Sequence, residues 1–348
     1  MHNMLTRKER TEIFNDNINI VWKKYYLKFI KDNIDEDWDW GCISENLNIT
    51  IESILENPDI PWNWKYISNN QNITMEIIND NPDKPWNWGY EGISMGKNIT
   101  MEIVQTNPDK PWDWKYISMN PNVTTEFILN NLDKSWDWKY LSRNENITME
   151  FILNNPDKPW DWGYISRNPN LTMEFILNNP DKSWDWVFIS LNENITFDII
   201  LDNINKPWDW FSISMKTNIT LDIVLANPTK PWDWKLLSDN PNLTMEFILA
   251  NPDKEWDWDA LSNNPNITIE SILENPDKPW DWLFISLNEN ITIAFIQNNP
   301  NYDWEYSSLS CCTFAKEKEE FRNKQYRRYM ASYKIQQWWK ERTMSPII

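Results

Sequence analysis

The apolar residues of this chain recur in a unit of 24 residues, and each unit holds two short apolar groups separated by polar turns. The frame Trp-x-Trp marks the unit eleven times, from Trp38/Trp40 to Trp280/Trp282, with one 26-residue step that two extra residues near Glu91-Gly92 explain. Tyr302-Asp303-Trp304 is interpreted as a twelfth, altered copy. A short fixed period predicts a solenoid, in which each unit buries its apolar face against its neighbours.

Residues 107–130 show how one unit predicts two helices. Asp113 is the expected N-cap of the first helix, which ends before Pro121 because the residue preceding a proline leaves the α region. Thr124 is the expected N-cap of the second, which ends near Asn130 with an asparagine in a left-handed cap. Helices of about two turns are shorter than the ~12–15 residues that an isolated helix needs in water, so packing between units must supply the stability.

The tryptophan pairs are assigned to the core and not to a ligand-binding ribbon, because each Trp buries roughly 150–250 Å² and short helices need that area. We expect the first Trp of each pair to be the more buried one. The indole N–H of the second is expected to reach a carbonyl near the surface. The predicted core residues of the central repeats are Trp112, Trp114, Ile117, Trp136, Trp138, Trp160, Trp162, Trp184 and Trp186.

The pattern predicts an all-α solenoid of about twelve 24-residue two-helix repeats with helical N- and C-terminal caps. Residues 1–37 form the N-terminal cap, residues 38–312 the repeat array, and residues 313–348 a basic C-terminal capping or docking helix. At ~8–10 Å per packed helix layer, the array is expected to follow an open arc of roughly 100–120 Å. A leucine-rich repeat has a similar period but needs an apolar residue where this chain has Lys65.

Charge and composition limit the classes of partner and the compartment that are expected for this chain. The chain carries a net charge of −19, and residues 313–348 carry nine Lys/Arg and four Asp/Glu. An acidic array repels phosphate backbones, so nucleic-acid binding along the repeats is not expected. No apolar run has the length of a membrane span. Three cysteines, Cys42, Cys311 and Cys312, are too few for a disulfide framework and predict a soluble protein in a reducing, intracellular compartment.

The repeated polar residues favour structure over chemistry. Eleven Asn-x-Thr triplets and the acidic residues beside each cap recur with the unit, and neither catalysis nor metal binding needs eleven copies. We therefore predict no catalytic residue, no metal site and no cofactor. One cluster is a candidate for docking a partner, because it partly matches a calmodulin-binding IQ helix. It consists of Ile335, Gln336, Trp338 and Trp339.

The unit from Asp113 to Trp138 resembles the short tandem repeats of proteins from Mimivirus-like giant DNA viruses, which read Asp-Trp-x-x-Leu-Ser-x-Asn-Pro-Asn. The resemblance covers about residues 38–304 and carries no activity with it. The leading hypothesis is a non-enzymatic scaffold of viral origin that binds a protein partner. A virion structural component that assembles with copies of itself or with basic partners is the second hypothesis, and a metal-binding or enzymatic protein is the third. The pattern leaves open whether the C-terminal helix docks on the array or projects.

Overall fold

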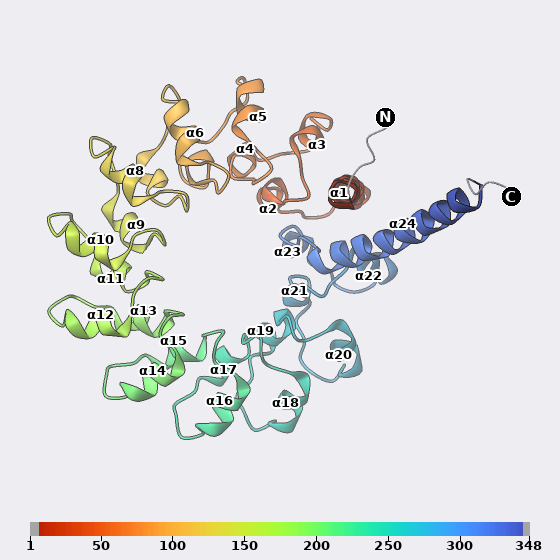
Figure 1. Cartoon of the computed structure of the whole chain (residues 1–348). Coiled ribbons are helices and arrows are strands. Elements are labelled where there is room, and N and C mark those ends of the chain that lie inside the picture. The colour runs from red at the N-terminus through yellow and green to blue at the C-terminus, as the bar shows by residue number, and fades with distance from the viewer. Residues whose placement is uncertain (1–6, 344–348) are drawn as a thin grey trace.

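The chain folds into two layers of short helices wound around a common centre (Figure 1). The computed structural model describes the backbone of residues 7–343 and the side chains of residue 12, residues 14–332 and residue 334. Every regular element in this part is helical, so the prediction of an all-α solenoid is confirmed. Two long helices, α1 (Arg7–Asp32) and α24 (Ala315–Thr343), flank the short ones.

Each repeat contributes an inner helix, and the first eleven also contribute an outer helix that follows a threonine cap. The inner helix starts at the second aromatic residue of the pair in every repeat except the third, where it starts at Ile93. The inner helices are α2 (Trp40–Glu45), α4 (Trp64–Ile67), the 3-10 helix η1 (Ile93–Met95), α7 (Trp114–Ile117), α9 (Trp138–Arg143), α11 (Trp162–Ile165), α13 (Trp186–Leu191), α15 (Trp210–Ser214), α17 (Trp234–Leu237), α19 (Trp258–Asn263), α21 (Trp282–Ile285) and α23 (Tyr306–Leu309). The outer helices are α3 (Ile51–Leu55), α5 (Met75–Asp80), α6 (Met101–Thr106), α8 (Thr125–Leu129), α10 (Met149–Asn154), α12 (Met173–Asn178), α14 (Phe197–Asp202), α16 (Leu221–Ala226), α18 (Met245–Ala250), α20 (Ile269–Glu274) and α22 (Ile293–Asn298).

The predicted N-caps are confirmed. Asp113 accepts a hydrogen bond from the Lys115 backbone N–H, and the Thr124 hydroxyl accepts one from Phe127. The first helix ends ahead of Pro121 as predicted, because α7 ends at Ile117. The predicted left-handed cap is wrong, since Asn130 has a φ of −78°. Instead the next residue, Asn131, donates its side-chain amide back to the Phe127 carbonyl.

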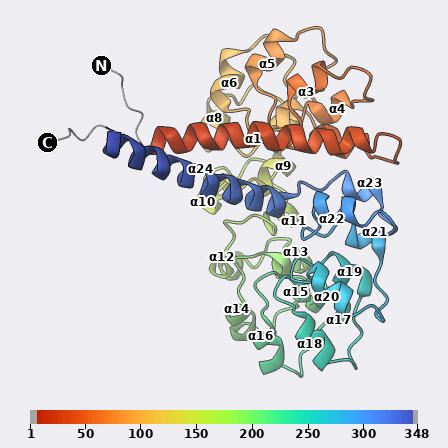
Figure 2. The same cartoon turned by 90° about the vertical axis from the view of Figure 1, so that its right-hand side faces the viewer.

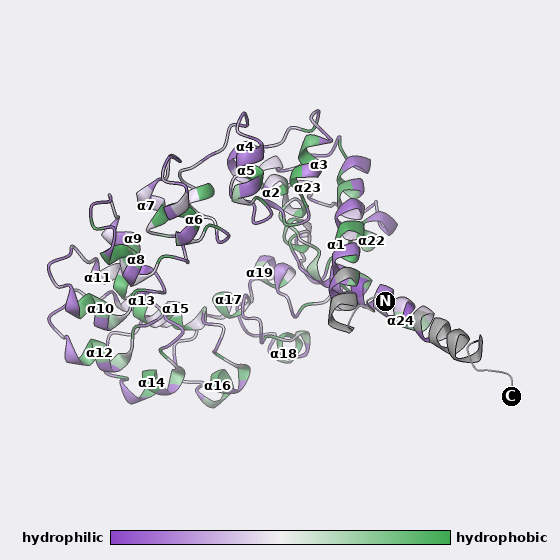
Figure 3. Cartoon of the chain, turned by 45° about the horizontal axis from the view of Figure 1, so that its top comes forward, coloured by the Kyte–Doolittle hydropathy of each residue, from purple (hydrophilic) through white to green (hydrophobic). Residues whose placement is uncertain are grey.

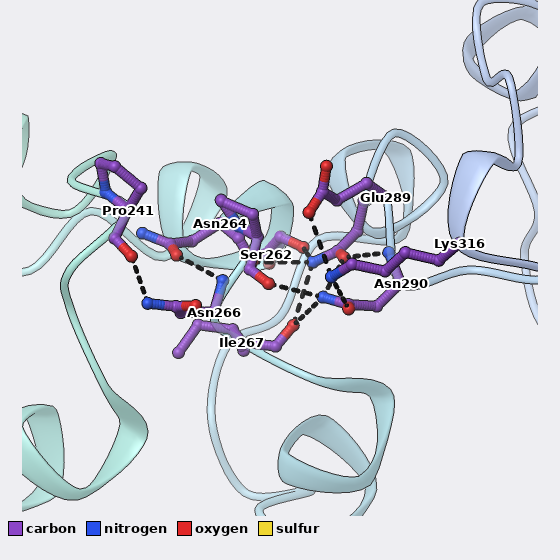
Figure 4. A network of polar contacts seen from close by, with 10 residues as sticks. Pro241, Ser262, Asn264, Asn266, Ile267, Glu289, Asn290 and Lys316 are labelled. Carbon is purple, nitrogen blue, oxygen red and sulfur yellow. Dashed lines mark hydrogen bonds and ion pairs between the residues drawn. The ribbon is translucent and has the colours of Figure 1, made fainter. Parts of the chain in front are cut away.

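A serine and an asparagine connect each repeat to the next. Ser118 donates its hydroxyl to the Trp114 carbonyl and accepts a hydrogen bond from the Asp137 N–H of the following repeat. Asn120 donates to the carbonyls of Ser94 and Gly96 in the preceding repeat. Both side chains are fully buried. Figure 4 shows the same network at the far end of the array, where the Asn-x-Thr asparagines Asn266 and Asn290 also donate to carbonyls of the repeat before.

The tryptophans pack against the buried aliphatic side chains of the core. The short helices combine hydrophobic and hydrophilic residues (Figure 3). Ile117 is fully buried and Trp136 is 8% exposed. The other predicted core residues are half-buried and pack against the core, namely Trp112, Trp114, Trp138, Trp160, Trp162, Trp184 and Trp186. The indole prediction is wrong, because the first Trp makes the hydrogen bond: Trp112 donates to the Asn107 carbonyl at 2.8 Å.

The second Trp of each pair contacts the first Trp of the next. The rings of Trp114 and Trp136 meet edge to face, with centroids 5.2 Å apart. Trp138 and Trp160 repeat this contact at 5.0 Å. Edge-to-face aromatic pairs contribute about 0.5–1.5 kcal/mol beyond their buried area, so the contact stabilises every junction between repeats.

The twelfth repeat reads Trp304-Glu305-Tyr306, which corrects the assignment of Tyr302-Asp303-Trp304. Trp304 donates its indole N–H to the Asn299 carbonyl, as the first Trp of other repeats does. Tyr302 takes the place of the loop lysine and stacks on Trp282, with ring centroids 4.3 Å apart. In an ordinary repeat a lysine occupies that place, and the Lys254 ammonium lies 5.0 Å from the centre of the Trp234 ring. No residue is missing from the last repeat.

The two ends of the array meet, so the expectation of an open arc is wrong. We call this junction, between residues 38–48 and residues 304–313, the seam. The Asp39 N–H donates to the Ser310 hydroxyl, and the Asn46 amide donates to the Cys312 carbonyl. The rings of Trp38 and Tyr306 meet edge to face at 5.0 Å. These contacts have the same form as those between neighbouring repeats, so the solenoid closes into a ring.

The N-terminal helix completes the ring by supplying the outer helix of the twelfth repeat. Phe29 and Ile30 of α1 are buried, and Asn33 donates to the Phe29 carbonyl. Trp38 then donates its indole N–H to the Asn33 carbonyl, as in an ordinary repeat. The twelfth repeat therefore combines α23 from one end of the chain with the last turns of α1 from the other.

The C-terminal helix lies along α1 instead of covering an exposed end of the array (Figure 2). Phe321 contacts Trp22, with ring centroids 5.8 Å apart, and Tyr329 contacts Phe14 at 5.1 Å. Glu317 also accepts hydrogen bonds from the first backbone N–H groups of α22. Helix α24 thus docks on the ring at the seam.

A disulfide joins Cys42 to Cys311 across the seam. The two residues are 269 positions apart in the sequence, and their Cα atoms lie 5.0 Å apart. The expectation that all three cysteines are reduced is therefore wrong. Spacing in the sequence gave no sign of the pair, because only ring closure brings the first and last inner helices together.

We predict that Cys42→Ser lowers the stability of the ring. A cross-link that closes so long a loop contributes roughly 5 kcal/mol in the chain-entropy model. Thermal unfolding without reductant should show a lower midpoint for the variant, and reductant should lower the wild-type midpoint toward the same value. Cys312→Ser, which alters the unpaired cysteine, should leave the effect of reductant intact. An unchanged midpoint for Cys42→Ser would contradict the prediction.

One repeat has a lysine in place of the buried asparagine represented by Asn120. Lys216 is 1% exposed and donates its ammonium group to the Asn192 carbonyl. Burial lowers its pKa to about 8, partly offset by the Glu193 carboxylate. Lysine also lacks the side-chain oxygen that accepts a hydrogen bond from the backbone two residues later, as Asn168 does from Asn170. The Asn218 side-chain oxygen in this repeat is buried without a hydrogen-bond partner.

We predict that Lys216→Asn stabilises the protein by about 1–3 kcal/mol at pH 7, since it removes a buried charge and restores the hydrogen bonds. A lysine in the unfolded chain has a pKa of about 10.4, so between pH 8 and pH 10.4 the unfolded chain binds a proton that the folded protein has released. Wild-type stability therefore rises with pH in that window, and the advantage of the variant should shrink. Urea unfolding at pH 7 and pH 9.5 measures both values. An advantage that did not change with pH would contradict the titration of Lys216.

Candidate functional site

The inner helices turn one side toward the outer helices and the other toward the centre of the ring (Figure 1). In α9, Leu141 and Ser142 are buried, whereas Lys139 and Arg143 are exposed and Tyr140 is half-buried. The same division recurs around the ring. The first, second, fifth and seventh residues after the second Trp form what we call the inner wall.

Six successive repeats carry an aromatic residue at the second of these positions. This aromatic ladder consists of Tyr66, Tyr90, Tyr116, Tyr140, Tyr164 and Phe188. The rings of Tyr90 and Tyr116 lie 5.6 Å apart. The remaining repeats have Cys42, Ser212, Leu236, Ala260, Phe284 and Ser308 there, so the ladder occupies one half of the wall.

Cations from each repeat lie over the aromatic rings of the next. The Lys115 ammonium is 5.7 Å from the centre of the Tyr140 ring, and the Lys139 ammonium is 4.7 Å from that of Tyr164. The Arg167 guanidinium lies 4.4 Å from the centre of Phe188. Cation–π contacts at exposed sites contribute about 0.5–1 kcal/mol each, so they orient the cations while leaving the charge available to a ligand.

The two-residue insertion at Glu91-Gly92 lies in this ladder. It replaces the ordinary inner helix by η1, and the Asn87 side-chain amide donates to the Tyr90 carbonyl. A Cβ on Gly92 would lie 2.3 Å from the Asn87 carbonyl oxygen, so the turn requires glycine.

Glu91 in the insertion has a φ of 51°, a left-handed backbone that costs energy in a residue other than glycine. Its carboxylate pairs with Lys65 at 2.8 Å, and this hydrogen bond lowers the pKa of Glu91 and raises that of Lys65. Tyr90 is 50% exposed, whereas the other ladder residues are half-buried. The insertion therefore presents an additional aromatic surface to the centre of the ring.

A hollow of about 580 Å³ runs along this half of the wall. Residues from six successive repeats line it, which only a concave surface allows. They are Glu45, Asn69, Gln71, Met95, Lys97, Met119, Pro121, Tyr140, Arg143, Asn144, Glu145 and Pro169.

The wall is basic in the half that carries the ladder and acidic in the other half. At the inner-wall positions and the insertion, repeats two to seven carry six cations and three carboxylates: Lys65, Lys97, Lys115, Lys139, Arg143 and Arg167 against Glu91, Glu145 and Glu193. The other six repeats carry one cation and four carboxylates: Lys235 against Glu45, Asp239, Asp259 and Glu289. A basic half-wall on a chain of net charge −19 is a local reversal of sign.

The candidate docking residues predicted from the sequence lie elsewhere. The backbone of α24 continues through Ile335, Gln336, Trp338 and Trp339, and their side chains lie outside the described residues. The aromatic ladder was not predicted from the sequence, because the predictions rest on residues that all repeats share. The signal that reveals the ladder is the second residue after the Trp pair, which is aromatic in six successive repeats.

No family model, curated protein or solved structure matches this chain. Among the helices of residues 7–343, none is long and apolar enough to cross a membrane. The described His, Cys, Asp and Glu side chains form no group that could hold a metal ion.

Proposed function

We propose that the protein is a non-enzymatic ring scaffold that binds a protein partner on the inner wall. The observation that carries the proposal is the aromatic ladder with its overlying cations, which extends across six repeats and borders the hollow. Tyrosine and arginine are enriched in protein interfaces because each combines a large contact area with polar groups. The resemblance to giant-virus repeat proteins supports a viral origin for this scaffold.

The repeated carboxylates support a role without catalysis. The aspartate between the two tryptophans caps an inner helix, as Asp161 does by accepting from the Tyr164 N–H. The acidic residue after each threonine cap, such as Glu150, lies in the first turn of an outer helix, where it interacts favourably with the helix dipole. These carboxylates stabilise helix ends throughout the array. The residues of the aromatic ladder have no structural role that the other repeats share.

We predict that a photo-crosslinking amino acid at Tyr140 or Tyr164 captures the same protein in cells that naturally produce the scaffold. Both residues lie on the ladder, and an enclosed partner would contact both. Leu177 on the outer helix α12 is the control, because it is 46% exposed and faces away from the ladder. Capture at Leu177 with none at the ladder would contradict the proposal.

A second function, a structural component that assembles with copies of itself, is favoured by a row of exposed leucines on the outer helices. The row recurs at one position in seven successive repeats with exposures from 37% to 58%. It consists of Leu129, Leu153, Leu177, Leu201, Leu225, Leu249 and Leu273. Regular exposed apolar surface of this kind is typical of association sites.

If the leucine row mediates assembly, sedimentation velocity should show association that increases with protein concentration. The combined variant Leu153→Lys, Leu177→Lys and Leu201→Lys should then sediment as a monomer. The control Glu150→Lys and Glu174→Lys adds positive charge to the same helices and keeps the leucines. A wild-type protein that remains monomeric at all concentrations would exclude assembly through this row.

A further inference from the structure

We propose that the half-wall formed by the aromatic ladder and its six cations binds an extended acidic polypeptide segment. The inference rests on the proposed scaffold function and specifies the chemistry of the partner. Three observations carry it: the sign of the charge, the state of the cations, and the geometry of the ladder.

The first observation is charge complementarity. The half-wall holds three more cations than carboxylates, whereas the array as a whole is strongly acidic. An acidic segment is therefore attracted to the half-wall and repelled by the acidic half opposite. Complementary charge of this kind directs a partner to one surface and excludes the others.

The second observation concerns how the lysines are paired. Six outer-loop lysines are neutralised by the aspartate before them, as in the 3.1 Å pair of Lys158 with Asp157. On the half-wall, Lys65 is the one cation with an ion pair within the described part of the chain. Lys97, Lys115, Lys139, Arg143 and Arg167 have no carboxylate partner there. Aromatic rings lie beneath three of them, Lys115, Lys139 and Arg167, and fix the position of their charge.

The third observation is the spacing of the ladder. Six rungs on packed helices extend on the order of 40 Å along the wall. An extended peptide advances ~3.3 Å per residue, so about 12 residues span the ladder. Alternate side chains of such a peptide point to the same side. Carboxylates on that side can pair with the cations while the aliphatic parts of the same side chains lie on the tyrosine rings.

The same observations favour a peptide over a nucleic acid. Glu91, Glu145 and Glu193 lie among the wall cations and would face a continuous phosphate backbone. The net charge of −19 adds a long-range repulsion that grows with the charge density of the ligand. A peptide that carries a carboxylate at every second residue matches the separated cations with less charge.

The test uses the full-length protein and a fluorescent 12-residue peptide with glutamate at alternate positions and leucine or proline between. Fluorescence anisotropy measures its affinity at low and at moderate salt. A matched peptide with glutamine for glutamate and a 12-nucleotide single-stranded DNA are the comparison ligands. We expect the acidic peptide to bind at least tenfold more tightly than either, with an affinity that falls as salt increases.

Matched variants locate the site. Lys115→Gln with Lys139→Gln should weaken the acidic peptide at least tenfold, whereas Lys235→Gln, at the equivalent position outside the ladder, should change affinity less than twofold. Tyr116→Ala with Tyr140→Ala should also weaken it, and Leu236→Ala should not. Unfolding midpoints within 2–3 °C of wild type verify that each variant is folded. Lys115 and Lys139 are exposed, so the lysine variants still test the site even if the tyrosine variants unfold.

Three results would overturn the inference: equal binding of the glutamine peptide, equal loss from Lys235→Gln, or tighter binding of the DNA. Absence of peptide binding, combined with capture of a partner at Tyr140 and Tyr164, would reject the acidic chemistry and leave the scaffold function standing. Capture at Leu177 alone would reject the scaffold function itself.

Discussion

The hydrogen bonds that the buried asparagines represented by Asn120 make to the preceding repeat are the constraint on which the structure depends. Helices of four to six residues leave most of their terminal carbonyls without a partner inside the helix. The Asn168 side-chain amide lies within hydrogen-bond distance of three carbonyls of the preceding repeat, on Ser142, Asn144 and Ile147, and shares its two N–H groups among them. Because an unpaired buried polar group is costly, each of the nine repeats with this asparagine must hold one height and one angle relative to the preceding repeat. The other three repeats have Gly96, Lys216 and Cys312 in its place.

This fixed step explains why the array closes. When every junction imposes the same small rotation, the rotations add, and the twelfth repeat arrives at the first with the geometry to make the same contacts. The hydrogen bond from Asp39 to Ser310 and the ring contact between Trp38 and Tyr306 are two of these contacts. A closed ring has no end repeat with an exposed core, which removes the need for the polar end caps that open solenoids require. The divided twelfth repeat makes closure depend on both ends of the chain.

Local features of this fold could be predicted from the sequence, and closure could not. Asp113 and Thr124 cap their helices as expected, because capping depends on a few adjacent residues. Closure depends on a rotation between repeats that no short segment encodes. The Cys42–Cys311 disulfide was missed for the same reason. The last repeat was shifted by two residues because Tyr302, which replaces a lysine, was taken for the first aromatic residue of the pair.

Residues that differ from the repeat pattern distinguish positions used for function from positions that the fold requires. A residue present in every repeat, such as the serine represented by Ser118, is explained by a contact that every junction needs. Tyr116 and Lys115 have no such explanation, since repeats with Leu236 or Ala260 at the tyrosine position make the same junctions. The Glu91-Gly92 insertion adds a backbone conformation that the fold does not require, and its result is an exposed Tyr90 on the ladder. Lys216 shows the opposite case, a departure that lies in the core and weakens the hydrogen bonds between repeats. Some residues differ from the repeat pattern, cost stability and face the ring centre. They therefore identify the half-wall as the surface that the fold alone does not explain.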